Sequence, residues 1–386
     1  MLYLLIALAC VLALAGFVLI KRRGAGSAVV LKDAPGPFGA KLADIPAAQP
    51  GPASEFVCGV GNAAAILPTR WDIPEELMVF RRIEVFELPF ETHRALMDRI
   101  VRIPRPPVGL QKLLSPGFLE QASPDDLSEL ILAEPHLAAK VLATVNSPFH
   151  GLQKPVTSVA QGVTYLGLNT VRSICLQCLM SESLRPSDPK LKPIFERWSH
   201  ASALASQLCI RLGQRVGIPD PGSMATLVVL SFLGHMAALS LLPAEATVRN
   251  AALGFLERTR REQEELGLCA GELGCLMMNE WGMPPAIVED VRIIDRILTT
   301  APKQLDAERG LRPALSYYCA RIGEKLASGE WKDLEPAIPE TLQGPEFFHL
   351  QTHFMIRPRM TQLAVDFRDP AFVAEVAGML RGLGTA

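Results

Sequence analysis

Two histidines, His200 and His235, lie in segments whose pattern predicts helices, and each imidazole could ligate a metal ion or pack in a core. Imidazoles and carboxylates together bind a divalent ion, which lowers the pKa of a bound water so that it can attack phosphorus. The segment around His235, "LSFLGHMAALSLLP" (residues 230–243), carries no charged residue, so we expect its helix to be buried nearly all round. A lone histidine in such a helix is usually a hydrogen-bonded core residue. The segment alone leaves both interpretations open.

Two other pairs of potential ligands lack the context of a metal site. Cys175 and Cys178 form a C-x-x-C inside a helical pattern, without a second pair at zinc spacing, and the eight cysteines are interpreted as reduced core residues. His349 and His353 lie four residues apart in "FFHLQTHFM", where a metalloprotease motif would have glutamate after the first histidine and this chain has Leu350. We therefore expect neither a metal nor another cofactor.

The composition excludes nucleic acid as an expected partner. The chain has 386 residues, of which 49% are hydrophobic, enough for one large core or two smaller ones. Its formal net charge is −2 and its pI is about 6.4, without a basic stripe beyond the one that flanks the N-terminal apolar run.

The N-terminus predicts a membrane anchor. Residues 2–20, "LYLLIALACVLALAGFVLI", contain no charge and are long enough to cross a bilayer, and "KRR" (residues 21–23) follows directly. Because basic residues stay on the cytoplasmic side, we expect an uncleaved single-pass helix in the inner (cytoplasmic) membrane, with the C-terminal domain in the cytoplasm. Residues 1–23 are thus anchor and basic flank, and the Gly/Ala/Pro-rich residues 24–54 form a flexible linker. Residues 55–99 mix strand-like and helical patterns and are left unassigned.

The elements that must position His200 and His235 are helices. Ser123 is an expected N-cap followed by Pro124, Pro135 divides two helices, and Thr157 or Ser158 caps the next. Gly167 ends that helix and Asn169 is expected to cap the following one. The body is therefore predicted to be all-α, with further helices over 194–216, 224–242, 248–266, 270–280, 284–298 and 311–327.

Read in order, these segments resemble the HDOD domains, relatives of the HD-type metal phosphohydrolases. The resemblance covers residues 100–325 and leaves residues 326–386 as a C-terminal helical extension. It implies an HD-like bundle of helices and a bacterial signal-transduction role. It rests on landmarks in order: "IPRPPVGLQKLL" (103–114), "NSPFHG" (146–151), "PVTSVAQGVTYLGL" (155–168), "FERWSHASALASQL" (195–208) and "EELGLCAGELGCLMMNEWGMP" (264–284).

The resemblance also implies where a metal site would lie, and this chain departs from it. HD-type hydrolases use a histidine on one helix, a His-Asp pair on a second and an aspartate on a later helix. His200 matches the first histidine, but Gly234 and His235 stand at the His-Asp pair, and Ala270 stands at a further position usually held by histidine. The late-aspartate region, "ALSYYCARIGEKL" (314–326), has no aspartate. We therefore expect no enzyme activity.

The remaining site residues are expected to be structural. His235 is interpreted as a core residue of a decayed site, hydrogen-bonded towards His200, with Trp198 and Trp281 in the same helical core. In "NSPFHG", a helix is expected to end at Asn146, and this loop (Asn146, Ser147 and His150) is either a structural turn or a partner-binding surface.

The prediction is a membrane-anchored, catalytically inactive HDOD protein that acts as a signalling or regulatory interaction module. Its expected partners are signalling proteins, and a homo-oligomer is compatible with the sequence. Two alternatives stay open: a divergent HD-type phosphohydrolase with a rebuilt site, and a non-catalytic nucleotide sensor that retains the ancestral pocket.

Overall fold

The computed structural model describes residues 73–104, 108–113, 115, 118, 121–147, 152, 154–300, 310–355 and 357–382, which belong to one compact unit. The predicted anchor (1–23), the linker (24–54) and residues 55–72 lie outside the described residues. Every regular element within the described ranges is helical, so the prediction of an all-α body is confirmed. The elements are α2 (Glu75–Met78), η1 (Val85–Glu87), α3 (Phe90–Ile100), α4 (Val108–Leu113), α6 (Pro124–Leu132), α7 (Pro135–Val145), α8 (Val159–Leu166), α9 (Leu168–Ser183), η3 (Pro189–Leu191), α10 (Lys192–Val216), α11 (Pro221–Ser231), α12 (Leu233–Leu241), α13 (Ala244–Ala251), α14 (Phe255–Leu266), α15 (Ala270–Glu280), α16 (Pro285–Arg296), α17 (Leu311–Ala327), η5 (Glu335–Ala337), η6 (Pro345–Phe347), η7 (Leu350–Met355), α18 (Pro358–Asp366) and α19 (Pro370–Gly382).

Helix ends follow the expected capping chemistry, with one correction. Ser123 forms a capping box with Asp126 at the start of α6, and the Ser158 hydroxyl accepts a hydrogen bond from Gln161 N at the start of α8. Asn169 is not an N-cap, because α9 already begins at Leu168 after Gly167, whose φ of 81° serves the turn. The Asn169 side chain is thereby free for the contacts described below.

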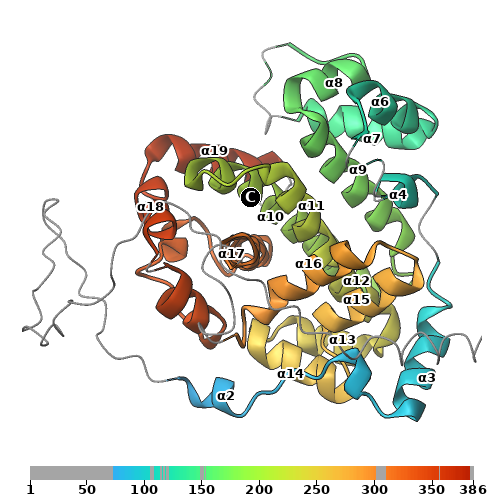
Figure 1. Ribbon diagram of the computed structural model, residues 1–386, viewed down its shortest axis with the longest axis vertical. Helices are drawn as coiled ribbons and strands as arrows, with labels where there is room; N and C mark the ends of the chain where they lie inside the picture. Colours follow the sequence, from blue (N-terminus) through green and yellow to red (C-terminus); the bar gives the residue numbers. More distant parts are fainter. Residues whose placement is uncertain are drawn as a thin grey trace, which may run out of the picture. The chain divides into compact units, whose positions relative to one another are not determined.

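The centre of the body is built on α10 and α17. Figure 1 shows α17 nearly end-on, with α10, α11 and α16 around it, and each of these three helices packs against α17. Gly323 permits the close approach of α10, since a Cβ there would lie 2.6 Å from the Ala201 carbonyl oxygen. Residues Pro221–Leu241 (α11 and α12) are apolar and long enough to cross a membrane, but 89% of their most apolar window is buried inside the protein. They act here as core helices.

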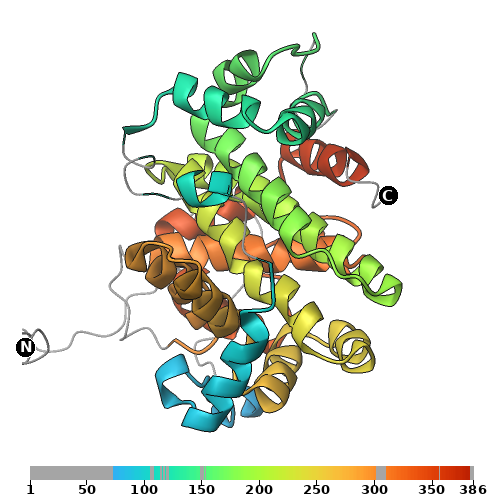
Figure 2. The same cartoon turned by 90° about the vertical axis from the view of Figure 1, so that its right-hand side faces the viewer.

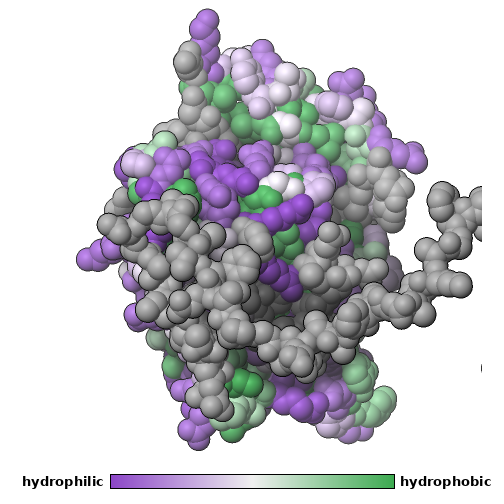
Figure 3. Space-filling model, turned by 60° about the vertical axis from the view of Figure 1, so that its left-hand side comes forward, coloured by the Kyte–Doolittle hydropathy of each residue, from purple (hydrophilic) through white to green (hydrophobic). Residues whose placement is uncertain are grey.

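Helices α6, α7 and α8 gather at one end of the body, and α13 and α14 lie at the other (Figures 1 and 2). The first group packs on α9, which in turn packs on α11 and so joins it to the centre. On the face shown in Figure 3, hydrophobic residues are interspersed with hydrophilic ones.

The C-terminal extension packs onto α10. Arg215 on α10 forms an ion pair with Asp366 (2.9 Å), and its guanidinium lies 4.7 Å from the ring centre of Phe372 on α19. Arg211 adds an ion pair to Glu375 at 2.5 Å. As expected, α19 starts after Asp369, whose side chain accepts a hydrogen bond from Ala371 N.

Candidate functional site

Helices α12 and α15 touch backbone to backbone at the position where the resemblance places the metal-binding histidine. A Cβ on Gly234 would overlap the Ala270 carbonyl oxygen and would lie 2.8 Å from Gly274 N. Glycine is therefore required at residue 234 for the two helices to pack at this distance. A histidine at this position would force α12 and α15 apart.

His235 is enclosed by aromatic rings. Its imidazole stacks on Trp198 of α10 with ring centres 4.9 Å apart, and the ring of Phe255 on α14 meets it edge-on at 6.3 Å. Only 3% of the residue is exposed. Burial, together with the positive charges of Arg258 and Arg321, holds the pKa of His235 well below its usual range, so the ring is neutral. Neither ring nitrogen has a hydrogen-bond partner among the residues that the structure describes, so the expected bond towards His200 is not formed.

His200 does not face His235. It follows Trp198 by two residues on α10, which corresponds to a rotation of about 200° around the helix. Because Trp198 faces His235, His200 points to another side of α10, where it is half-buried and burial lowers its pKa. Trp198 and Trp281 belong to the hydrophobic core, and the buried His235 stacks on Trp198, whereas His200 is half-buried.

Two arginines and a glutamate occupy the space next to His235. Arg258 (α14) donates through Nη1 to Glu324 Oε1 (α17) at 2.5 Å, and Arg321 Nη1 lies 3.3 Å from the other carboxylate oxygen. The Arg321 guanidinium carbon is 3.3 Å from the ring centre of Phe255, and that of Arg258 is 4.7 Å from the ring centre of Trp198. We call Arg258, Glu262, Arg321 and Glu324, together with His235, the buried charge cluster.

Glu262 completes the buried charge cluster and links α14 to α15. Its Oε2 accepts a hydrogen bond from the backbone N of Ala270 (3.2 Å), and its Oε1 lies 3.8 Å from Arg258 Nε and 4.0 Å from His235 Nδ1. Ala270 is the residue at the further position that the resemblance usually gives to histidine. In this chain that position is used for a structural hydrogen bond.

The two glutamates of the cluster titrate in opposite directions. Burial alone would raise the pKa of Glu324, but Arg258 and Arg321 outweigh it and lower that pKa to about 2. Burial raises the pKa of Glu262 to about 7, because Arg258 and the Ala270 N–H offset only part of the desolvation. At neutral pH the cluster therefore holds two guanidinium charges, one firmly ionised carboxylate and one carboxylate near its midpoint.

The cluster has almost no free space. The cavity beside His235 measures about 10 Å³ and is lined by residues of α12, α14, α15 and α16. A water molecule needs roughly this volume, so a phosphodiester does not fit. Within the described ranges, no group of three or more His, Cys, Asp or Glu side chains could hold a metal ion.

A second ionic group docks residues 81–84 onto the body. Arg82 pairs with Glu272 of α15 at 2.7 Å, and Arg292 of α16 reaches the same carboxylate at 3.3 Å. The Ile83 N–H donates to the Gln263 side chain at 2.7 Å. The described part of the unassigned segment 55–99 contains α2, η1 and most of α3, and Arg82 and Ile83 tie it to α15 and α14.

The sequence contained a signal for the buried charge cluster, namely charged residues at positions of the apolar stripe of a helix. Such residues are normally interpreted as exposed because they are charged. In "FLERTRREQEEL" (255–266), Arg258 and Glu262 fall on the apolar stripe with Phe255 and Leu266, at spacings of three and four. On α17, Arg321 likewise follows the buried Tyr317 and Tyr318. Charged residues on a core stripe mark candidates for buried ion pairs.

The "NSPFHG" loop begins as expected, since α7 ends at Val145. The Asn146 side chain donates to the Leu142 and Val156 carbonyl oxygens (2.9 and 2.8 Å) and accepts from Val156 N at 2.7 Å. These contacts support the structural interpretation of Asn146. Ser147 is half-buried, and His150 lies outside the described residues.

Of the two other pairs of potential ligands, the structure describes both cysteine side chains and that of the first histidine. Cys175 is fully buried, and burial raises the pKa of the Cys178 thiol to about 11, so both stay protonated. His349 is buried just before the π-helix η7, with its ring edge-on to Phe348 at 5.1 Å. The side chain of His353 lies outside the described residues.

Comparisons with known proteins give a family and a fold. The family of HDOD domains matches residues 103–297, just over half of the chain. An HDOD domain protein with unknown function from Geobacter sulfurreducens is 16% identical, with 76% of this chain and 97% of that chain covered and a TM-score of 0.56. A protein from Shewanella amazonensis called "Putative phosphohydrolase" is 18% identical, with 75% and 98% covered and a TM-score of 0.53. One from Marinobacter aquaeolei called "Putative signal transduction protein" is 17% identical, with 76% and 65% covered and a TM-score of 0.49. At these identities the likeness to the first two structures shows the fold alone. No curated protein matches the chain.

Proposed function

Because the chain belongs to the HDOD domain family, we propose that it is a membrane-anchored, catalytically inactive HDOD protein that acts as a signalling or regulatory interaction module. The observation that carries the proposal is the packing at Gly234. The residue that would have to be a histidine ligand is the contact point of α12 and α15. A hydrolytic metal site needs about three protein ligands and an open position for water.

The buried charge cluster supports the same proposal. An ion placed beside His235 would meet the guanidinium groups of Arg258 and Arg321, which repel it. His200 cannot supply a second imidazole there, because it points to another side of α10. The nucleotide-sensor alternative loses support as well, since the cavity of about 10 Å³ at this place is too small for a nucleotide.

The test of inactivity uses the purified full chain under metal-replete conditions. Bound metals are measured by elemental analysis, and hydrolysis of cyclic dinucleotides and generic phosphodiesters is assayed. We expect neither stoichiometric metal nor turnover. Stoichiometric iron or manganese, with turnover abolished by His200→Ala, would establish the divergent phosphohydrolase instead.

The proposed anchoring and signalling role have separate tests. A reporter that is active only outside the cytoplasm, fused after Ala386, should stay silent, because "KRR" (21–23) keeps the following residues inside. Strong reporter activity would reverse the orientation. Mass spectrometry of proteins that co-purify from native membranes should recover signalling proteins, and recovery of this chain alone would contradict the interaction role.

A further inference from the structure

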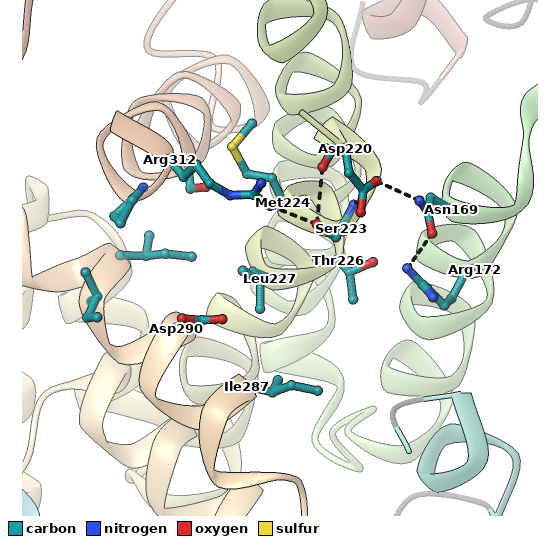
Figure 4. A pocket seen from close by; sticks show the side chains of 14 residues that line it. Asn169, Arg172, Asp220, Ser223, Met224, Thr226, Leu227, Ile287, Asp290 and Arg312 are labelled. Atoms are coloured by element: carbon teal, nitrogen blue, oxygen red, sulfur yellow. Dashed lines mark hydrogen bonds between the residues drawn. The ribbon is translucent and has the colours of Figure 1, made fainter. Parts of the chain in front are cut away.

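A cavity of about 510 Å³ opens between α9, α11, α16 and α17, apart from the buried charge cluster. Pockets of about 300–1,000 Å³ are the usual size for small-molecule sites. Figure 4 shows Asn169 and Arg172 projecting from one side and Arg312 and Asp290 from the other, with Leu227 and Ile287 between them. The cavity thus combines an apolar floor with charged groups at its edges.

Arg172 is the unusual group in this cavity. Only 2% of the residue is exposed, its Nε has no hydrogen-bond partner, and among the described residues no carboxylate lies within ion-pairing distance of it. Its Nη2 donates to the neutral amide oxygen of Asn169. Burial lowers the pKa of Arg172, and the charge of Asp220 offsets this only in part. A buried guanidinium without an anion is costly unless a ligand supplies one.

Close packing fixes this arrangement in place. A Cβ on Gly222 would overlap the side chain of Asn169, so the start of α11 lies directly against α9. Asn169 can therefore donate to Asp220 Oδ1 at 2.7 Å while it accepts from Arg172. Asp220 is itself committed to capping α11, because the same carboxylate accepts from Ser223 N at 3.2 Å.

Within the described part of the chain, the second arginine of the cavity also has no carboxylate in ion-pairing distance. Arg312 donates through Nη1 to the Pro219 carbonyl oxygen (2.9 Å) and through Nη2 to the Ser223 hydroxyl (2.8 Å), which are neutral acceptors. The floor between the two arginines is formed by the apolar side chains of Met224, Leu227, Ile287, Ile293 and Ile294. Asp220 and Asp290 at the rim disfavour ligands with several negative charges, such as nucleoside triphosphates.

We propose that this cavity binds a small monoanion with an apolar body, such as an arylalkyl carboxylate, with the carboxylate on Arg172 and the apolar part on the floor around Leu227. Arginine suits this role because its fork of N–H donors matches the two oxygens of a carboxylate. Binding at this site would let a ligand regulate the helical domain independently of the buried charge cluster.

The test uses three probes that differ only in their end group: 4-phenylbutyrate, 4-phenylbutan-1-ol and 4-phenylbutylamine. Each is titrated by calorimetry into the full chain in lipid nanodiscs, with empty nanodiscs as the blank. We expect one phenylbutyrate per chain, and at least tenfold weaker binding of the alcohol and the amine. No binding of the carboxylate, or equal binding of the alcohol, overturns the proposal.

Two variants locate the site and one controls for it. Arg172→Gln should weaken phenylbutyrate at least tenfold, and Leu227→Trp should abolish binding by filling the floor, without a change of charge. Arg197→Gln is the matched control, because Arg197 is also partly buried and donates to a neutral backbone oxygen, that of Ala251, away from the cavity. Its affinity should stay within twofold of the unmodified chain. If Arg172→Gln does not fold by circular dichroism, Leu227→Trp decides, and unchanged affinity in it refutes the site.

Discussion

Replacing Glu324 by glutamine should lower the Tm of the protein markedly, although the change removes only one charge. Glu324 pairs with both Arg258 and Arg321. The pKa of Glu324 falls from 4.5 to about 2 on folding, and each pKa unit corresponds to about 1.4 kcal/mol. The ionised carboxylate therefore contributes about 3 kcal/mol, in line with the cost of about 3–5 kcal/mol for breaking a buried ion pair.

The assay is thermal unfolding of the full chain in detergent, followed by tryptophan fluorescence, to which Trp198, stacked on His235 of the cluster, contributes. A loss of about 3 kcal/mol corresponds to a decrease in Tm of roughly 6–10 °C. Glu257→Gln is the matched control, since Glu257 also lies between two arginines, Arg260 at 3.5 Å and Arg261 at 3.1 Å, but on the exposed side of α14. Exposed pairs contribute about 0–1 kcal/mol, so this variant should melt within roughly 3 °C of the unmodified chain.

The pH dependence provides an independent check. Because folding lowers the pKa of Glu324, its contribution is present above pH 4.5 and is lost as the pH falls towards 2. Glu324 stays ionised in the unmodified chain from pH 5 to pH 9, so Glu324→Gln should be the less stable protein throughout that range. If Glu324→Gln melts like Glu257→Gln, the two arginines are not held by this carboxylate, and our account of the cluster is wrong.

Three further changes test other parts of the structure. Since burial raises the pKa of Glu262 from 4.5 to about 7, ionisation of Glu262 destabilises the folded protein as the pH rises through that window, by about 3 kcal/mol. Glu262→Gln should remove this loss in melts compared at pH 5 and pH 8, and an unchanged pH profile would contradict the assignment. Gly234→Ala should destabilise the protein by about 1–3 kcal/mol or more through overlap with Ala270, whereas its control Gly378→Ala in α19, where no atom lies closer than 4.0 Å, should be neutral or stabilising. Equal effects on Tm would show that α12 and α15 are not in close contact. Asn146→Ala should lower the free energy of unfolding by about 1–3 kcal/mol, because Val156 N and O lose their partner, while Thr144→Ala, which loses one exposed local hydrogen bond, should lower it clearly less. A reversed order would refute the structural role of the loop.

The helices could be predicted from sequence because their signals are local. Ser123 with Pro124, Pro135, Ser158 and Gly167 set helix ends through short-range capping, and the structure confirms each of them. The prediction that Asn169 caps the following helix was wrong, because α9 already begins at Leu168. Gly167 already provides the turn, so the Asn169 amide is drawn into contacts with Arg172 and Asp220, which lie 3 and 51 residues away.

The candidate site was less predictable because its charges contradict the usual pattern. Arg258, Glu262, Arg321 and Glu324 would be exposed in most helices, and here ion pairs within and between helices accompany their burial. The direction of His200, in contrast, could have been read from its spacing. Residues two positions apart on a helix lie on nearly opposite sides of it, so Trp198 and His200 cannot both face His235.

The cluster also bears on whether such a site could regain a metal under our proposal of inactivity. Glu324 joins α14 to α17, and Glu262 joins α14 to α15, so carboxylates and arginines here cross-link helices of the interior. The candidate ligand position at Gly234 is already used by the fold, because the absence of a side chain there lets α12 meet α15. A histidine at residue 234 would separate two helices before it could bind an ion, and the two guanidinium groups would still repel that ion. Several residues would have to change together, because each single step towards the ligand set destabilises the fold that has to hold it.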